Sequence, residues 1–314
     1  MKKIYLIAPS GASLDMRSPL VGIEWLQKQG IEVLNTDCVN RVEQRFAGSD
    51  AERLAEVNQL ANLSPDSVVL AMRGGYGLHR LLPDIQWGAI AKAIHNGLQI
   101  CGHSDFTVFQ LGLLAKTGAV TLAGPMLNFD FACQGELGEG LTPNAFMWAH
   151  FQKAVNERKF DCTVQATQPF LRKPTVGKAS GMLWGGNLTV LAGLVGTPYL
   201  PTHQQTQGGI LFLEDVNEHP YRIERMLMQL LDAGILENQS AIVLGGFSAY
   251  RLYDNDRGYT LESAIEAVCK RLPDSIPVLT GLPFGHQAEK LTMPVGAQAH
   301  IQYDESGFSI QSHW

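Results

Sequence analysis

The segment ICGHSDFTVFQLGLLA places a serine, Ser104, where an apolar strand is expected to turn into an apolar helix. Such a turn exposes the serine hydroxyl at the carboxyl edge of a sheet, and the helix N-terminus favours negative charge that develops beside it. Ser104 is therefore a candidate nucleophile. However, Phe106 stands where a GxSxG motif has its second glycine, and a serine before a helix is commonly an N-cap. This segment alone leaves both roles open.

The segment AMRGGYG ends another apolar strand with two adjacent glycines, Gly74 and Gly75. Glycines in this place allow the backbone to approach a ligand closely and to turn its N–H groups toward an anion. A nucleotide site is weakly supported, because neither GxGxxG nor GK[ST] is present. An oxyanion hole formed by the N–H groups of Gly75 (or Gly74) and Asp105 would suit a serine nucleophile. A turn that needs unusual dihedral angles is the alternative.

An acid and a base follow in the second half of the chain. In GGILFLEDVNEHPYRIERML a strand delivers Glu214 to its carboxyl end, and Pro220 then opens an amphipathic helix. In TGLPFGHQAEKLTMPVG, His286 lies on a loop after a short strand, where an imidazole can act as a general base near neutral pH. The alternatives are a solvated carboxylate and a loop histidine without a role. His219 is expected to serve only the helix start.

The first half of the chain alternates apolar strands with helices. This pattern predicts a Rossmann-like domain, in which helices cover both faces of a parallel sheet and ligands bind beyond the carboxyl ends of the strands. Ser49 and Glu52 form a predicted capping box at one helix start. The expected strands are 4–8, 31–35, 68–72, 99–101 and 120–123, and the expected helices are 20–29, 49–62, 87–95 and 106–116.

The second half predicts a smaller domain of mixed α/β type. Its expected strands are 182–184, 210–213, 241–245 and 277–279, its helices are 221–233 and 261–271, and 297–311 is expected to form a hairpin. The proline-containing stretch QATQPFLRKPTVGK reads as a linker at 165–178, between a first domain at 1–164 and a second at 179–314. Ser104 then lies in one domain and the acid and base in the other, so the hinge is expected to affect activity.

The composition excludes several classes of protein. The 314 residues are 45% hydrophobic and carry a net charge of −6, and no basic stripe is present, so nucleic acid is not an expected partner. No apolar segment is long enough to span a membrane. Five scattered cysteines without CxxC spacing, and the absence of HExxH, predict no disulfide framework and no metal. Pro9 ends the first apolar run too early for a secretory signal, which predicts a cytoplasmic protein.

Several motifs occur together in one order. IAPSG, RFAG, RGGYG, GHSDFT, GPM, LWGGNL, LEDVNEHPYRIERML and GLPFGH, between Ile4 and Gly296, resemble the LD-carboxypeptidases, the murein tetrapeptide carboxypeptidase family of serine peptidases. The resemblance implies a catalytic triad of Ser104, Glu214 and His286 between two domains. It also implies release of the terminal D-alanine from muropeptide tetrapeptides during peptidoglycan recycling, in the cytoplasm, commonly by a homodimer, without a metal or organic cofactor.

A carboxypeptidase must also hold the free carboxylate of its substrate, most simply with an arginine or a helix N-terminus. Arg73 and Arg222 are candidates by position. The LWGGN segment suggests that Trp184 and Asn187 line the cleft, although Trp184 is equally suited to the core of the second domain.

Three alternatives to a murein peptidase remain at this point. A microcin-immunity peptidase would use the same triad on peptide-nucleotide amides. An α/β-hydrolase esterase shares the order serine, acid, histidine, but the chain lacks GxSxG. A non-catalytic two-lobed protein that binds a peptide or sugar would use Ser104 only as a helix cap.

Overall fold

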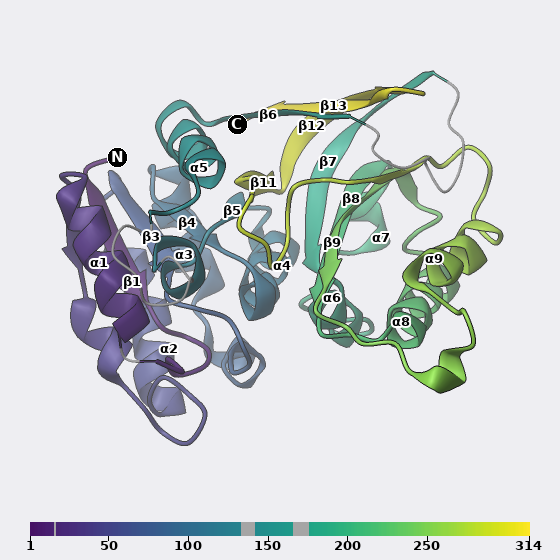
Figure 1. Ribbon diagram of the computed structural model, residues 1–314. Helices are drawn as coiled ribbons and strands as arrows, with labels where there is room; N and C mark the ends of the chain where they lie inside the picture. Colours follow the sequence, from purple (N-terminus) through teal and green to yellow (C-terminus); the bar gives the residue numbers. More distant parts are fainter. Residues whose placement is uncertain (16, 133–141, 166–175) are drawn as a thin grey trace.

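The computed structural model of the protein describes residues 1–15, 17–132, 142–165 and 176–314 (Figure 1). Within these ranges the strands form a six-stranded and a seven-stranded sheet. The first has the order β11-β5-β4-β3-β1-β2, and all its neighbours are parallel except β11 and β5. The second has the order β10-β9-β8-β7-β12-β13-β6 and is mixed. The predicted fold class, an α/β protein with a parallel first sheet and a mixed second sheet, is confirmed.

The first sheet consists of short apolar strands that alternate with helices. Its strands are β1 (Lys3–Ile7), β2 (Glu32–Leu34), β3 (Ser67–Ala71), β4 (Gln99–Gly102), β5 (Thr121–Ala123) and β11 (Met293–Val295). The helices around it are α1 (Arg17–Lys28), α2 (Asp50–Gln59), α3 (Trp87–His95), α4 (Thr107–Thr117) and α5 (Ala145–Glu157). The capping box of Ser49 and Glu52 starts α2, as predicted.

Helices cover both faces of the first sheet, because successive strand residues point to opposite sides. In β3, Val69 and Ala71 belong to the apolar cluster that contains α3 and α4, whereas Val68 and Leu70 belong to the cluster that contains α1 and α5. Strands β3 and β4 pair in parallel, so the segments that follow them leave the same edge of the sheet. These segments carry the glycine pair and Ser104, which the fold thereby brings together.

The second sheet contains the strands that carry the acid and precede the base. Its strands are β6 (Lys159–Gln165), β7 (Gly177–Asn187), β8 (Gly209–Val216), β9 (Gln239–Ser248), β10 (Val278–Thr280), β12 (Ala297–Asp304) and β13 (Gly307–His313). Its helices are α6 (Leu188–Gly193), α7 (His203–Thr206), α8 (Pro220–Asp232) and α9 (Leu261–Cys269). β12 and β13 form the predicted hairpin near the end of the chain.

Each sheet takes one strand from the other half of the chain. β6 pairs with β13 in the second sheet, and β11 pairs with β5 in the first. The predicted linker falls mainly on 166–175, outside the described residues, while Gln165 ends β6 and Gly177 begins β7. A division into domains at 1–164 and 179–314 stays a prediction.

Helix α4 lies between the two sheets (Figure 1). Buried apolar side chains form one cluster that runs from Val69 in β3 through Phe109 in α4 to Trp184 in β7 and Phe212 in β8. The helix that follows Ser104 is therefore packed against the sheet that carries Glu214.

Candidate active site

Ser104 lies in the tight turn between β4 and α4. Its φ is +61°, in the left-handed region that costs a residue with a side chain about 1–2 kcal/mol. Gly102 permits the close turn, because a Cβ built there would lie 2.6 Å from the ring of Phe106. The N-cap positions of the short 3₁₀ turn η5 (Ser104–Phe106) and of α4 are His103 and Phe106, so Ser104 caps neither element. A strained turn of this kind is typical of a displayed nucleophile.

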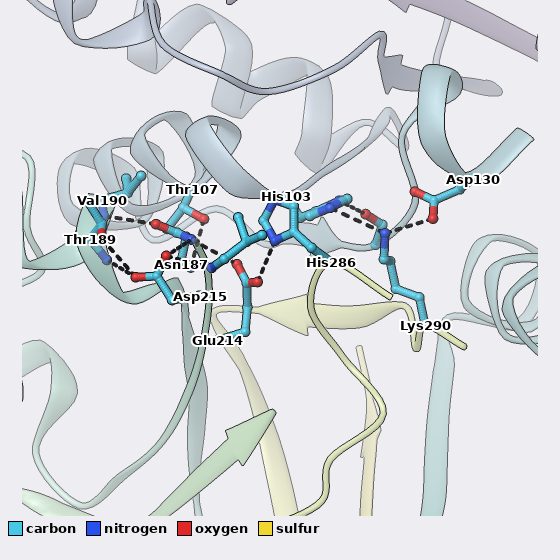
Figure 2. Close-up of polar contacts among 12 residues, drawn as sticks. His103, Thr107, Asp130, Asn187, Thr189, Val190, Glu214, Asp215, His286 and Lys290 are labelled. Carbon is cyan, nitrogen blue, oxygen red and sulfur yellow. Dashed lines mark hydrogen bonds and ion pairs between the residues drawn. The ribbon is translucent and has the colours of Figure 1, made fainter. Parts of the chain in front are cut away.

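His286 and Glu214 form a hydrogen-bonded pair (Figure 2). His286 Nδ1 lies 2.8 Å from Glu214 Oε2. Because a carboxylate only accepts, Nδ1 donates, and the lone pair of Nε2 is left to take a proton from another group. Glu214 is fully buried at the end of β8, and its Oε1 accepts a hydrogen bond from Asn187 Nδ2 at 3.2 Å. Glu214 thus fixes the orientation and the tautomer of the imidazole.

Ser104 and His286 line the same cavity, which has a volume of about 820 Å³. The serine comes from the turn after β4, and the histidine from the loop after β10, so both sheets contribute to the wall. Within the described ranges no hydrogen bond joins the two side chains. The volume is that of a pocket for a small molecule or a short peptide.

The glycine pair after β3 packs directly against the Ser104 turn. A Cβ built on Gly74 would lie 2.7 Å from Ser104 Oγ and 3.1 Å from the backbone N of Asp105. Gly75 has a φ of +110°, which favours glycine, and both glycines line the cavity. The backbone of the pair and the N–H of Asp105 are therefore near the serine hydroxyl, as an oxyanion hole requires. The use of Gly75, Gly74 and Asp105 as its donors stays a prediction.

The side chain of Asp105 anchors this turn. Its Oδ2 accepts hydrogen bonds from Ser10 Oγ at 2.7 Å and from Leu78 N at 3.2 Å. Ser10 follows β1 and Leu78 follows the glycine pair, so one buried carboxylate holds the loops after β1, β3 and β4 together. The sequence predicted a role only for the backbone of Asp105, because these partners become neighbours only in the folded sheet.

A cluster of three buried polar side chains in the cavity wall was missed by the sequence analysis. Lys290 Nζ lies 2.7 Å from Asp130 Oδ1 and 3.3 Å from His103 Nε2 (Figure 2). Burial, together with the nearby Lys290 and His286, holds the pKa of His103 well below its usual range. The positions 103, 130 and 290 have no spacing pattern. The only sequence signals were that His103 adjoins Ser104 and that Lys290 follows His286 by four residues.

Asn187 connects the acid to the helix of the nucleophile. Its Nδ2 donates both to Glu214 Oε1 and, at 3.1 Å, to Asp215 Oδ1. Its backbone N donates to Thr107 Oγ1 in the first turn of α4, at 3.2 Å. Asp215 also accepts two hydrogen bonds from Thr189, and burial raises the pKa of the Asp215 carboxyl. In the described structure Asn187 supports Glu214 and is not part of the cavity wall, so its predicted contact with substrate stays a prediction.

Arg73 lies in the wall of the cavity, next to the glycine pair. Its Nη1 donates to the backbone oxygen of Ala12 at 2.7 Å, and within the described ranges no carboxylate is paired with it. Burial and the neighbouring Arg45 lower the pKa of the Arg73 guanidinium. An arginine held in this way is suited to an anionic group of a ligand.

The other two predicted substrate residues lie elsewhere in the described structure. Arg222 forms an ion pair with Glu218 at the start of α8. Trp184 is fully buried, and its Nε1 donates to Gln239 Oε1 at 2.9 Å. It therefore packs in the core, which was the alternative to its predicted place in the cleft. Contact of Arg222 or Trp184 with a substrate stays a prediction.

Comparison with known proteins identifies the family. The N-terminal domain of LD-carboxypeptidases matches residues 4–124, and the C-terminal domain of LD-carboxypeptidases matches residues 180–301. The crystal structure of muramoyltetrapeptide carboxypeptidase from Oxalobacter formigenes is 40% identical, with a TM-score of 0.85, over 100% of this chain and 99% of that one. This chain belongs to the LD-carboxypeptidase family. Ser104 lies in the first matched range, and Glu214 and His286 lie in the second.

Relatives of two kinds are similar to this chain. The probable murein peptide carboxypeptidase of Bacillus subtilis is 29% identical over 98% of this chain and 91% of its own length. The microcin C7 self-immunity protein MccF of Escherichia coli is 28% identical over 93% of this chain and 88% of its own length. Likeness to these relatives does not by itself choose between their substrates.

In the ranges that the structure describes, no group of three or more histidine, cysteine, aspartate or glutamate side chains is placed to hold a metal ion. None of the helices in those ranges has the length and apolar character needed to cross a membrane.

Proposed function

We propose that this LD-carboxypeptidase is a serine peptidase that hydrolyses the L,D-peptide bond of murein tetrapeptides and releases the terminal D-alanine in peptidoglycan recycling. The observation that carries the proposal is the shared cavity. Ser104, which has a strained backbone and caps no helix, lines the same cavity as His286, which a buried glutamate orients. The names of the murein-peptide relatives support the choice of substrate.

In the proposed reaction Ser104 Oγ attacks the carbonyl carbon of the scissile bond while His286 Nε2 takes its proton. Glu214 stabilises the imidazolium that forms. The oxyanion lies against the N–H groups of Gly75 (or Gly74) and Asp105. A positioned general base such as His286 contributes about 10²–10⁴ in rate. His286 then gives its proton to the leaving amine of D-alanine, and water hydrolyses the acyl-enzyme with His286 again as the base.

The charge of the cavity wall supports an anionic peptide as substrate. Arg73 lines the cavity without a carboxylate partner in the described structure, and Arg45 adds a second positive charge nearby. A murein tetrapeptide carries several free carboxylates, and one of them would pair with Arg73.

The proposal is tested by mass spectrometry of a muropeptide tetrapeptide after incubation with the wild-type protein, Ser104→Ala and a control, Ser180→Ala. Ser180 lies in β7 and its hydroxyl contacts His300. We expect the wild type and Ser180→Ala to release D-alanine, and Ser104→Ala to lose about 10⁴-fold or more in turnover. Equal release by Ser104→Ala would exclude the serine mechanism, and no release by the wild type would exclude the substrate.

Likeness to MccF supports a second candidate, hydrolysis of a peptide-nucleotide amide by the same triad. A peptide-nucleotide should therefore be assayed beside the tetrapeptide. Turnover of the nucleotide compound alone would replace the murein substrate and keep the roles of Ser104, Glu214 and His286.

We also propose that the protein works in the cytoplasm as a homodimer. Cys38 and Cys101 are buried thiols without a disulfide partner, as is usual in a reducing compartment. The dimer rests on the family resemblance, and light scattering of the purified protein tests it, since a monomeric mass would contradict it.

A further inference from the structure

The cavity wall contains a buried ion pair that the proposed triad does not use. The side chains of Lys290 and Asp130 are 2% and 3% exposed, and Lys290 Nζ lies 2.7 Å from Asp130 Oδ1. Both residues line the cavity beside Ser104 and His286. Because a buried ammonium is costly without a partner, Asp130 explains how Lys290 can be held there.

His103 fixes the direction of the Lys290 ammonium. His103 Nδ1 lies 2.9 Å from the backbone oxygen of Gly124, which only accepts, so Nδ1 carries the hydrogen. Nε2 is then an acceptor for Lys290 Nζ at 3.3 Å. An ammonium has three donors, and in the described structure Asp130 and His103 use two of them, which leaves one for a ligand in the cavity.

Lys290 is connected to the catalytic His286 through the ring of His103. The rings of His103 and His286 stand edge to face with their centroids 5.0 Å apart, so Lys290, His103 and His286 are consecutive neighbours (Figure 2). In the proposed reaction His286 protonates the leaving amine, which must therefore lie beside it. The terminal carboxylate of D-alanine is one carbon away from that amine.

Arg73 lies next to the glycine pair in the same cavity wall. A Cβ built on Gly75 would lie 3.5 Å from Arg73 Nη2, so the guanidinium adjoins the predicted oxyanion hole. Arg73 thus adjoins the glycine pair, whereas Lys290 adjoins His103, whose ring lies against that of the catalytic His286.

We infer that Lys290 binds the terminal carboxylate of the leaving D-amino acid and makes the enzyme selective for a free C-terminus. This inference rests on the proposed function. Asp130 and His103 are positioning residues that hold the ammonium, and Arg73 is left for another carboxylate of the peptide.

The experiment compares two tetrapeptides that differ only at the C-terminus, one ending in D-alanine and the other in D-alaninamide. For the wild type we expect kcat/KM to favour the acid by about 10- to 100-fold, the usual effect of a hydrogen bond to a charged group. Lys290→Met should abolish this preference, because it should lower the rate for the acid much more than the rate for the amide. Lys270→Met, at an exposed position after α9, should keep the wild-type preference.

Two further variants keep the test informative if Lys290→Met does not fold, since that change leaves Asp130 unpaired. Lys290→Met combined with Asp130→Asn removes both charges, keeps an acceptor for the backbone N–H of Met126, and should also abolish the preference. Arg73→Gln should retain it. A preference that survives loss of Lys290, or that is lost in Arg73→Gln instead, would overturn the inference. Absence of D-alanine release by the wild type would overturn the proposed function, and the inference with it.

Discussion

At the scale of single residues, Gly74 shows how closely the candidate site is packed. A Cβ built on Gly74 would lie 2.7 Å from Ser104 Oγ, which is closer than the Cβ of a real residue approaches another side chain. A methyl group there must displace either the serine hydroxyl or the backbone that is expected to bind the oxyanion.

We predict that Gly74→Ala lowers kcat by about 10²–10³, as does the loss of an oxyanion donor, and destabilises the fold by about 1–3 kcal/mol. The measurements are steady-state kinetics on the tetrapeptide and urea unfolding. Gly88→Ala is the control, because a Cβ on Gly88 in α3 meets nothing within 4 Å. Full activity of Gly74→Ala would show that the glycine pair is only a turn.

His103 gives the stability a dependence on pH. Its pKa in the folded protein is well below the usual value of 6.5, so below pH 6.5 the unfolded chain binds a proton that the folded chain does not. Stability therefore falls as the pH falls from 6.5 toward the pKa of folded His103, by at most about 1.4 kcal/mol per pH unit.

We predict that His103→Gln reduces this loss of stability between pH 7 and pH 5, measured as the free energy of unfolding in urea at each pH. The raised pKa of Asp215 has the opposite sign but is common to both proteins, so it cancels in the comparison. His313→Gln, at an exposed position in β13, should behave like the wild type. An unchanged slope in His103→Gln would contradict the prediction.

At the scale of secondary-structure elements, the important contact joins α4 to the end of β7. Thr107 Oγ1 accepts the N–H of Asn187, whose side chain holds Glu214. The turn that displays Ser104 and the acid that orients His286 are thus linked through two residues.

We predict that Thr107→Val lowers kcat with little change in KM, because the acid and the nucleophile lose their common anchor. It should also cost about 1–3 kcal/mol, since it leaves the N–H of Asn187 buried without an acceptor. Thr117→Val, at the other end of α4, is the matched control, because its hydroxyl contacts only the local backbone. A loss of stability with full kcat would limit Thr107 to a structural role.

At the scale of the whole molecule, the two sheets share strands and one apolar core. β6 and β11 each pair in the sheet of the other half, and one apolar cluster runs from β3 through α4 to β8. These connections oppose independent unfolding of the two halves, even though the expected hinge between them remains a prediction.

We predict that the slowest amides of β3 and β8 exchange with the same free energy and the same dependence on urea, measured by native-state hydrogen exchange. Both then report one global unfolding. A lower free energy for either strand would show that the sheets unfold separately.

Some elements were missed because the signal was not local. β6 is an edge strand with only one fully buried residue, and its partner β13 lies about 150 residues later in the chain. β11 has three residues and includes Pro294, which a strand tolerates at the edge of a sheet. Helix α5 was also not predicted.

The sequence by itself determined the fold class, most of the buried strands and helices, the family, and the candidates Ser104, Glu214 and His286. It could do so because strand and helix periodicity and the family motifs are properties of contiguous residues. Only the tertiary structure decided that Asn187 supports Glu214, that Trp184 packs in the core, and that Lys290, Asp130 and His103 meet in the cavity wall. These contacts join residues 27 to 187 positions apart, and a hydrogen bond or ion pair of that kind depends on how the strands and loops pack, which no local pattern encodes.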